Sequence, residues 1–303
     1  MKKIDRLVEE VLKERRRKAF LFAEQNLKLA RQNKTFLSLE QQEIDETISL
    51  ANLLAQTETD LPENRKKLEN IKQKKLEVLK ELGLVEADIL PKFHCAACQD
   101  TGRNNCKCKA QIKSKILLKK AGIEGNLEKF EEAKFVSEDA DKVIKILKQF
   151  AEKFPNVTKK NLFICGETGV GKTFMTSCLA NELIKKGVYV YITTAFNLNN
   201  TFVEYCKAKD EAKQAVLEPL LESEVLFIDD LGTEPILNNI TLNYLYLILN
   251  ERTISGKSTV INSNLDAEGI IDRYGERIFS RIINKRIGLA LKLEGEDLRL
   301  KKQ

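Results

Sequence analysis

Eight consecutive residues decide the fold of this chain: Gly166, Glu167, Thr168, Gly169, Val170, Gly171, Lys172 and Thr173. They match the P-loop pattern, and they stand between an apolar run and a helical pattern, as a P-loop requires. The glycines allow a tight turn whose backbone N–H groups point at phosphate oxygens, next to the positive end of the following helix. Lys172 can reach the β- and γ-phosphates of ATP, and the Thr173 hydroxyl can bind Mg²⁺. The sequence therefore predicts a nucleotide site, with a glycine turn in an ordinary α/β fold as the alternative.

A second apolar run, residues 225–228, ends in two acids, Asp229 and Asp230. Ligands of parallel α/β sheets bind where the strands end, so we expect both carboxylates beside the P-loop. In that place Asp229 would hold Mg²⁺, and Asp230 would orient the attacking water or accept its proton. An ordinary transition from strand to turn is the alternative for these acids.

Polar amides follow a third apolar run, residues 259–261. At the same edge of the sheet, one amide can contact the γ-phosphate or the attacking water. Asn264 is our first choice for this contact and Asn262 the second. A simple turn is again the alternative.

The second half of the chain alternates between short apolar runs and helical patterns. The runs cover residues 162–165, 188–192, 225–228 and 259–261, and the helical patterns cover 139–154, 172–186, a stretch to about 221, and 240–255. This alternation predicts an α/β fold whose parallel sheet has helices on both faces. Helical spacing of apolar residues predicts three earlier helices, at about 4–30, around 44–55, and from Pro62 to Gly83.

The composition is that of a globular protein with many exposed helix faces, because 43% of the residues are hydrophobic and 32% are charged. A length of 303 residues predicts more than one unit. We place a helical partner-binding region at 1–90, a zinc module with a basic helix at 91–125, and the ATPase core at 126–303. The sequence lacks a long apolar run and a signal-peptide pattern, so we expect a cytoplasmic protein with no membrane contact.

Four of the seven cysteines fall within a short segment, as Cys95-Ala-Ala-Cys98 and Cys106-Lys-Cys108. Four thiolates at this spacing suit one tetrahedral Zn²⁺, with His94 as a possible substitute ligand. A redox dithiol and unligated cysteines are the alternatives. Seven basic residues and no acid lie between residues 103 and 120, and this stretch can meet the phosphates of single-stranded DNA.

Four segments together resemble the AAA+ ATPases of the bacterial helicase-loader group, the DnaC and DnaI type, to which the transposition helper IstB is related. They are GETGVGKT at 166–173, FIDDLGTE at 227–234, VINSNL at 260–265 and GERIFSRI at 275–282. The resemblance implies that Arg281, or as second choice Arg277, is an arginine finger that completes the site of a neighbouring subunit. A helix that merely exposes two arginines is the alternative.

The same resemblance implies the function. It indicates an ATP-dependent protein that binds a DnaB-like hexameric replicative helicase, loads it onto single-stranded DNA, and self-associates through its ATPase core. It further implies that the core lacks a C-terminal lid domain, that Glu234 assists the short carboxylate of Asp230, and that Arg299 is a weak candidate for a nucleotide contact. An IstB-like helper on duplex DNA and an ATP-binding adaptor without turnover are the alternatives.

Overall fold

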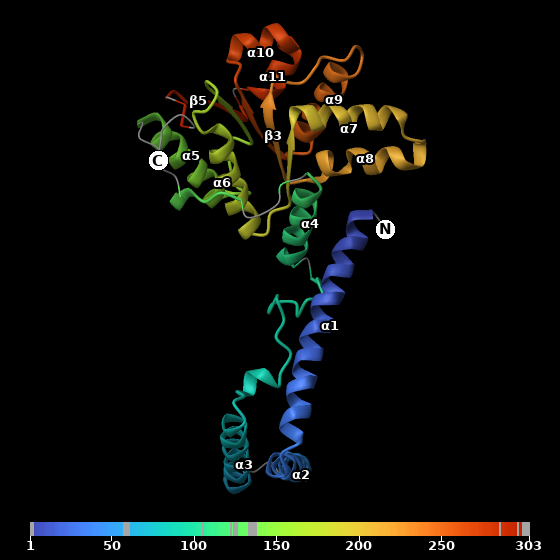
Figure 1. Ribbon diagram of the computed structural model, residues 1–303, viewed down its shortest axis with the longest axis vertical. Helices are drawn as coiled ribbons and strands as arrows, with labels where there is room; N and C mark the ends of the chain where they lie inside the picture. The colour runs from blue at the N-terminus through green and yellow to red at the C-terminus, as the bar shows by residue number, and fades with distance from the viewer. Residues whose placement is uncertain are drawn as a thin grey trace. The chain divides into compact units, whose positions relative to one another are not determined.

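The structure is a computed structural model that describes residues 3–56, 61–104, 106–121, 123, 127–132, 138–284, 286–295 and 297–298. The chain divides into two compact units, which Figure 1 shows. One unit comprises residues 9–104, and the other comprises residues 105–303 together with residues 1–8. The domain boundaries expected near residues 90 and 125 stay predictions.

The larger unit is built on a five-stranded parallel sheet with the strand order β2-β3-β4-β1-β5. The strands are β1 (Asn161–Cys165), β2 (Val190–Thr194), β3 (Val225–Leu231), β4 (Ser258–Ser263) and β5 (Gly288–Lys292). Four of them correspond to the predicted apolar runs, although β2 begins two residues later than expected. The edge strand β5 was not predicted. The parallel sheet itself is confirmed.

Each face of the sheet carries its own hydrophobic core. In β1, Leu162 and Ile164 belong to one core, while Phe163 and Cys165 belong to the other. Successive side chains of a strand point to opposite faces, so the two cores lie on opposite sides of the sheet. All residues of β1 and β4 are buried, as expected for central strands of a sheet that is covered on both faces.

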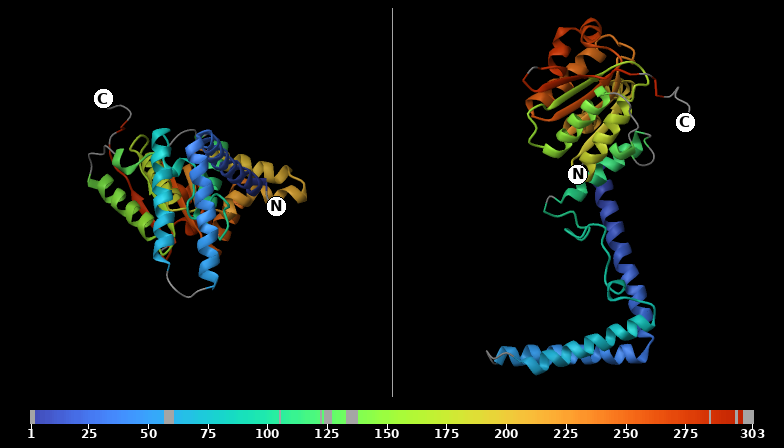
Figure 2. Two further views of the ribbon diagram at one scale, coloured as in Figure 1. Left: turned by 90° about the horizontal axis from the view of Figure 1, so that it is seen from below. Right: turned by 90° about the vertical axis from the view of Figure 1, so that its left-hand side faces the viewer.

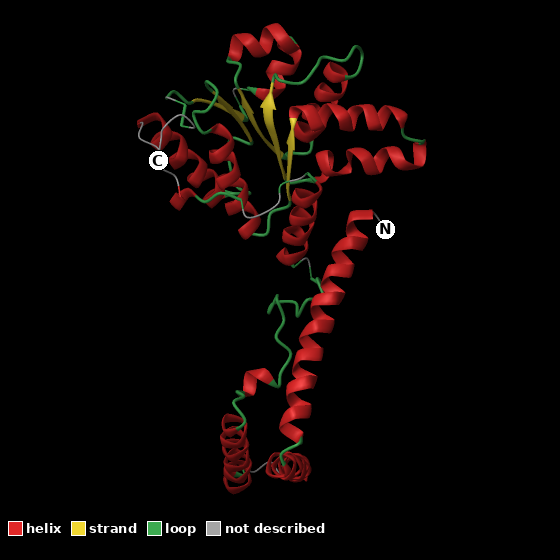
Figure 3. Cartoon of the chain, in the orientation of Figure 1, coloured by secondary structure: helices red, strands yellow, loops and turns green. Residues whose placement is uncertain are grey.

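Helices cover both faces of the sheet, as Figure 3 shows. The core that contains Leu162 is covered by α4 (Lys107–Lys120), α5 (Glu138–Lys153) and α6 (Lys172–Lys185), together with the 3₁₀ turn η2 (Phe130–Glu132). The helices that contribute to the core with Phe163 are α7 (Ala195–Lys207), α8 (Asp210–Glu222), α9 (Thr241–Ile254), α10 (Ala267–Tyr274) and α11 (Glu276–Ile282). The α/β fold with a parallel sheet flanked by helices is therefore confirmed.

The unit of residues 9–104 is helical, as predicted. It contains most of α1 (Lys3–Arg31), then α2 (Lys34–Gln56), α3 (Pro62–Glu81) and the 3₁₀ turn η1 (Glu86–Asp88). Helices α2 and α3 lie side by side, as Figure 2 shows, and a small core forms around Phe36 and Leu79, both fully buried. Pro62 begins α3 because its fixed φ suits the first turn, and Gly83 follows its end at φ 73°.

Among the helices of the described residues, none combines the length and the apolar character that a membrane crossing demands.

Candidate functional site

The P-loop joins β1 to α6 and depends on glycine in two ways. Gly169 and Gly171 have φ values of 85° and 98°, a backbone region that residues with a Cβ rarely adopt. The chain beyond β5 also approaches closely: a Cβ on Gly166 would lie 2.1 Å from the carbonyl oxygen of Leu293, and one on Gly169 would lie 2.0 Å from Oδ1 of Asp297. Substitution at either glycine would therefore displace the loop or its neighbour.

Lys172 lies folded over the P-loop, with 5% of its surface exposed. Its Nζ donates hydrogen bonds to the carbonyl oxygens of Gly166 at 2.8 Å and Glu167 at 2.7 Å, and to Oδ1 of Asn264 at 2.7 Å. These three acceptors are neutral, and a more strongly attracting phosphate oxygen can replace them. Thr168 and Val170 complete the loop between these contacts.

Thr173 and Asp229 face each other across the ends of α6 and β3. The Thr173 hydroxyl donates to Oδ1 of Asp229 at 3.0 Å. Burial raises the pKa of Asp229 above its ordinary value, and the nearby charge of Asp230 adds to the effect. A hydroxyl and a carboxylate are hard oxygen ligands, the kind that Mg²⁺ binds, and a cation there would relieve the cost of the buried negative charge.

Asp230 has an unusual backbone, with φ at 54°. Its N–H donates to Oδ1 of Asn262 at 2.8 Å, and its carbonyl oxygen accepts from the Thr233 hydroxyl at 2.9 Å. The pairing between β3 and β4 shifts register here, between Ile228 and Leu231. Non-glycine residues at positive φ are strained and often lie at functional sites, so the two hydrogen bonds hold Asp230 in a conformation it would not otherwise prefer.

The two candidate amides have different positions. Asn262 is buried, and besides accepting from Asp230 it donates through Nδ2 to the Thr176 hydroxyl at 3.2 Å. It therefore braces the end of β3, which carries Asp230. Asn264 contacts Lys172 directly, so it lies where a phosphate bound by Lys172 would also lie. The structure thus brings the P-loop, the acids and both amides to one edge of the sheet.

Glu234 lies beside this edge but is deeply buried, with 2% of its surface exposed. One carboxylate oxygen accepts from the Gly232 N–H at 3.0 Å, and the other accepts from the Tyr274 hydroxyl on α10. Arg273 donates to the Glu234 carbonyl oxygen. Burial, and next the hydrogen bond with Glu234, raise the pKa of Tyr274. Both carboxylate oxygens are engaged, so Glu234 ties the loop after β3 to α10.

Arg277 and Arg281 form a separate cluster with α9. Arg281 donates from Nε to Oδ1 of Asn250 at 3.0 Å and from Nη2 to the Tyr246 hydroxyl at 3.5 Å. The guanidinium carbon of Arg277 lies 3.9 Å from the centre of the Tyr246 ring, a cation–π contact. Hydrogen bonding from Arg277, and then from Arg281, lowers the pKa of Tyr246.

This arginine cluster lies far from the P-loop of its own chain. The Arg281 carbonyl oxygen accepts from Nδ2 of Asn161, the first residue of β1, at 3.0 Å. The P-loop begins five residues further along the strand, a rise of about 16 Å. In addition, α11 covers the face of the sheet opposite to α6. Arg299 lies outside the described residues.

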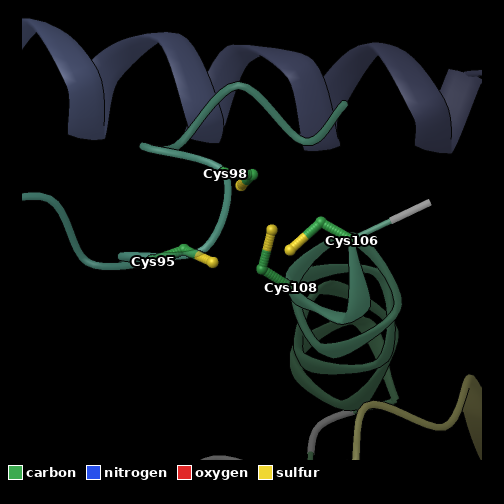
Figure 4. Close-up of side chains that lie close together, drawn as sticks. All are labelled: Cys95, Cys98, Cys106 and Cys108. Carbon is green, nitrogen blue, oxygen red and sulfur yellow. The ribbon is translucent and has the colours of Figure 1, made fainter. Parts of the chain in front are cut away.

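The four cysteines of the predicted zinc module lie together, as Figure 4 shows. The sulfur atoms of Cys95, Cys98, Cys106 and Cys108 are all within 4.8 Å of one another. A Zn–S length of about 2.3 Å places the sulfurs of a tetrahedral site about 3.8 Å apart, so a small contraction fits the ion.

The turn that carries the first two cysteines is fixed by hydrogen bonds. Asp100 is buried, and its carboxylate accepts from the backbone N–H groups of His94 at 2.8 Å and Cys95 at 3.1 Å. The Gly102 N–H donates to the Cys98 sulfur at 3.3 Å, a contact that stabilises a thiolate. Among the described residues, the cluster comprises the four cysteines without His94, so the donor set fits zinc.

Residues 103–303, well over half of the chain, match the family described as IstB-like ATP binding protein. The chain belongs to this family. A replicative helicase loader DnaC from Buchnera aphidicola subsp. Schizaphis graminum is 31% identical over 170 residues, covering 55% of this chain and 66% of the loader. The DnaC loader of Escherichia coli K12 is 25% identical over 137 residues, which cover 45% of this chain and 54% of that loader. The chain thus spans just under two thirds of the first of these relatives.

Solved structures similar to this family member include DnaI, with 23% identity, a TM-score of 0.47, and coverage of 56% of this chain and 89% of that chain. The structure of the DnaC helicase loader has 23% identity and a TM-score of 0.49, and the match covers 55% of this chain and 96% of that chain. The family match and the similarity to DnaC loaders confirm the resemblance to loaders of the DnaC type.

Two features of the site were missed by the sequence analysis. The segment after β5 lies along the P-loop, where the Leu293 N–H donates to the Cys165 carbonyl at 2.8 Å and the Leu298 N–H donates to the Gly169 carbonyl at 3.1 Å. The contacts of Tyr246 and Asn250 with the arginines were also missed. No local pattern marks either feature, because both depend on residues that are distant in the sequence.

Proposed function

We propose that this protein is an ATP-dependent loader that places a replicative helicase on single-stranded DNA, with ATP binding and hydrolysis as the switch. One observation carries the nucleotide part: Lys172 contacts Asn264 at 2.7 Å while Thr173 contacts Asp229 at 3.0 Å. The P-loop, β3 and β4 thereby contribute to a single site. The helicase part rests on the similarity to DnaC loaders.

The residues of the site divide the work of hydrolysis. The N–H groups of residues 166–173 and the Lys172 ammonium bind the phosphates, and Lys172 exchanges its neutral acceptors for phosphate oxygens. Thr173 and Asp229 would hold Mg²⁺, which would neutralise phosphate charge. Asp230 orients the attacking water or accepts its proton, while Asn264, released from Lys172, contacts the γ-phosphate or the water. After phosphate leaves, Lys172 can return to Asn264, which gives two states for a switch.

The arginine cluster supports self-association through the ATPase core. An arginine side chain cannot span the distance of about 16 Å from the start of β1 to the P-loop. Arg281 can therefore stabilise transition-state charge only on a nucleotide bound by another copy. This arrangement makes hydrolysis depend on assembly, so partner and DNA would stimulate the weak activity of the protein alone.

The region before the ATPase core supplies the proposed partner contacts. Helix α2 exposes four large apolar side chains, those of Leu37, Ile44, Ile48 and Leu54, which favour a protein partner such as a DnaB-like hexamer. The four cysteines would hold Zn²⁺ and fix the turn that precedes the basic helix α4. The lysines of α4 would meet the phosphates of single-stranded DNA. We retain residues 1–90 and 91–125 as the proposed partner-binding and zinc regions.

Two other functions have specific support. An ATP-binding adaptor without turnover is favoured by Glu234, because both of its carboxylate oxygens are already hydrogen-bonded and Asp230 must act unaided. A transposition helper on duplex DNA is favoured by the family description.

A single set of assays separates the three functions. Phosphate release is measured with the protein alone, with single-stranded or duplex DNA, and with a hexameric replicative helicase, and binding to the helicase is measured by pull-down. A loader binds the helicase and shows its highest turnover with helicase and single-stranded DNA. Helicase binding without turnover indicates the adaptor. Stimulation by duplex DNA without helicase binding indicates the transposition helper.

A further inference from the structure

Two pairs of side chains meet between α9 and α11, and each pair is spaced by one helical turn. Tyr246 and Asn250 lie on α9, and Arg277 and Arg281 lie on α11. Residues four apart share one face of a helix, so each helix presents two adjacent groups to the other. Asn250 and the Tyr246 hydroxyl accept from Arg281 at 3.0 and 3.5 Å, and the Tyr246 ring underlies Arg277 at 3.9 Å.

The cluster holds two positive charges close together without a carboxylate. In the described part of the chain, neither Arg277 nor Arg281 forms an ion pair. The acceptors are instead an amide oxygen, a phenol oxygen and a π face, all of them neutral. A carboxylate would fix an arginine but would also cancel its charge, whereas these neutral groups orient the guanidinium and leave its charge available to an anion.

The geometry leaves part of the Arg281 guanidinium open. Of the five N–H donors of an arginine, Nε–H is directed at Asn250 and one Nη2–H at Tyr246, which leaves the two donors of Nη1 and one of Nη2. Those remaining donors are arranged as a fork that suits two phosphate oxygens. An arginine that is already oriented loses less side-chain entropy when it binds, because its rotamers are restricted beforehand.

We propose that Asn250 and Tyr246 are positioning residues that set Arg281 for a γ-phosphate bound by another copy of the chain. The proposal rests on the trans-acting role of Arg281 in the proposed function and identifies which residues set it. Asn250 acts through the Nε–H contact, and Tyr246 acts through its hydroxyl on Arg281 and its ring beneath Arg277. Neither residue touches the nucleotide of its own chain.

The expected effects follow from this division of roles. Loss of an arginine finger lowers turnover by about 10³-fold or more. Asn250→Ala leaves the arginine present but loosely oriented, so we expect kcat to fall by about tenfold, the effect of about 1.4 kcal/mol. ATP affinity should stay within about twofold, since Arg281 acts where transition-state charge develops. Tyr246→Phe keeps the ring beneath Arg277 and the Asn250 contact to Arg281 and removes the hydroxyl contacts, of which the one from Arg281 is the longer of its two hydrogen bonds, so its effect should be smaller, about threefold.

The first test is a double-mutant cycle with a matched control. Phosphate release is measured for the full chain with helicase and single-stranded DNA. In the Arg281→Ala background, Asn250→Ala should cause no further loss. The control is Asn243→Ala, the same substitution on an exposed residue of the same helix, whose side chain donates only to the Asn239 carbonyl at 3.1 Å. Normal kcat for Asn250→Ala, or an equal loss in both backgrounds, would overturn the proposal.

The second test uses the fact that in a trans contact one subunit supplies the P-loop and the other supplies the arginine cluster. A general loss of folding would not produce the pattern of restored activity expected from this division. Lys172→Ala subunits keep a good arginine cluster, so they should restore activity to Asn250→Ala subunits in mixtures. Arg281→Ala subunits should not restore activity to Asn250→Ala subunits, because both partners lack a working arginine cluster. The double variant Lys172→Ala, Asn250→Ala should also restore Arg281→Ala subunits less well than Lys172→Ala alone does. If it restores them equally well, Asn250 does not position Arg281.

Failure of the proposal and failure of the underlying function give different results. If Arg281→Ala itself hydrolyses ATP normally, the trans-acting role of Arg281 is wrong. If Arg281→Ala is inactive and Lys172→Ala complements it, but Asn250→Ala and Tyr246→Phe match wild type, only the positioning role is wrong. Thermal melting of each variant identifies a folding defect, and Tyr246→Phe then serves as the milder substitution.

Discussion

The buried contact between Tyr274 and Glu234 gives a sharp test of whether Glu234 is structural. Tyr274 is 4% exposed and Glu234 is 2% exposed, and the phenol donates to the carboxylate. Tyr274→Phe removes this donor and leaves a buried carboxylate oxygen without its partner, which costs about 2 kcal/mol of the free energy of unfolding. For a unit of this size, about 2 kcal/mol lowers the melting temperature by about 6 °C. If Glu234 only ties the loop to α10, turnover below the melting range should change less than threefold.

The assay combines thermal melting with phosphate release at 25 °C. Tyr205→Phe is the matched control, because the Tyr205 hydroxyl has no hydrogen bond to another described residue and its ring contacts Tyr244. In a Glu234→Gln background, the effect of Tyr274→Phe on melting should shrink. A melting temperature equal to that of the control would refute the structural role. A large loss of turnover in Glu234→Gln, with unchanged stability, would restore Glu234 as a catalytic candidate.

Three further predictions concern the nucleotide and zinc sites. Lys172→Ala should abolish turnover with the fold intact, and normal phosphate release from this variant would contradict the site assignment. Burial raises the pKa of Asp229 in the folded state. The free energy of unfolding therefore falls as the pH rises from the ordinary pKa of the carboxyl to its raised pKa, and the loss persists at pH 7. Asp229→Asn should therefore raise the melting temperature at pH 7 without Mg²⁺ while abolishing Mg²⁺-dependent turnover; a lower melting temperature would contradict this account. The purified protein should contain about one zinc per chain, and Cys95→Ser with Cys98→Ser should release it together with helicase binding; metal analysis that finds no zinc after gentle purification would count against the site.

The sheet and the nucleotide edge were predictable because local chemistry restricts them strongly. A P-loop needs glycine where φ is positive, and Gly169 and Gly171 both adopt such values. Central strands such as β1 and β4 are buried along their length, so they stand out as apolar runs. Asn264 was expected near the phosphates, and it contacts Lys172.

Other features depend on tertiary contacts that the sequence does not mark. The strand β5 pairs only with β1, at an edge, and its partly exposed residues give no continuous apolar run. The start of β2 is set by pairing of Val190 with Val225, so two preceding buried residues stay outside the strand. The contact between Asn250 and Arg281 joins residues 31 apart, and Glu234 meets Tyr274 across 40 residues. Such pairs become visible only when the helices are packed.

In the proposed function, ATP controls the transfer of a helicase ring to DNA. The most direct measurement is helicase retained on closed circular single-stranded DNA, which has no end to thread, after mixing with this protein and ATP and washing at high salt. We expect wild type to leave the helicase on the circle. We expect Lys172→Ala and Arg281→Ala to bind the helicase but to leave little of it on the circle. If the amount of retained helicase is the same with wild type, with either variant and without the protein, ATP does not control the transfer.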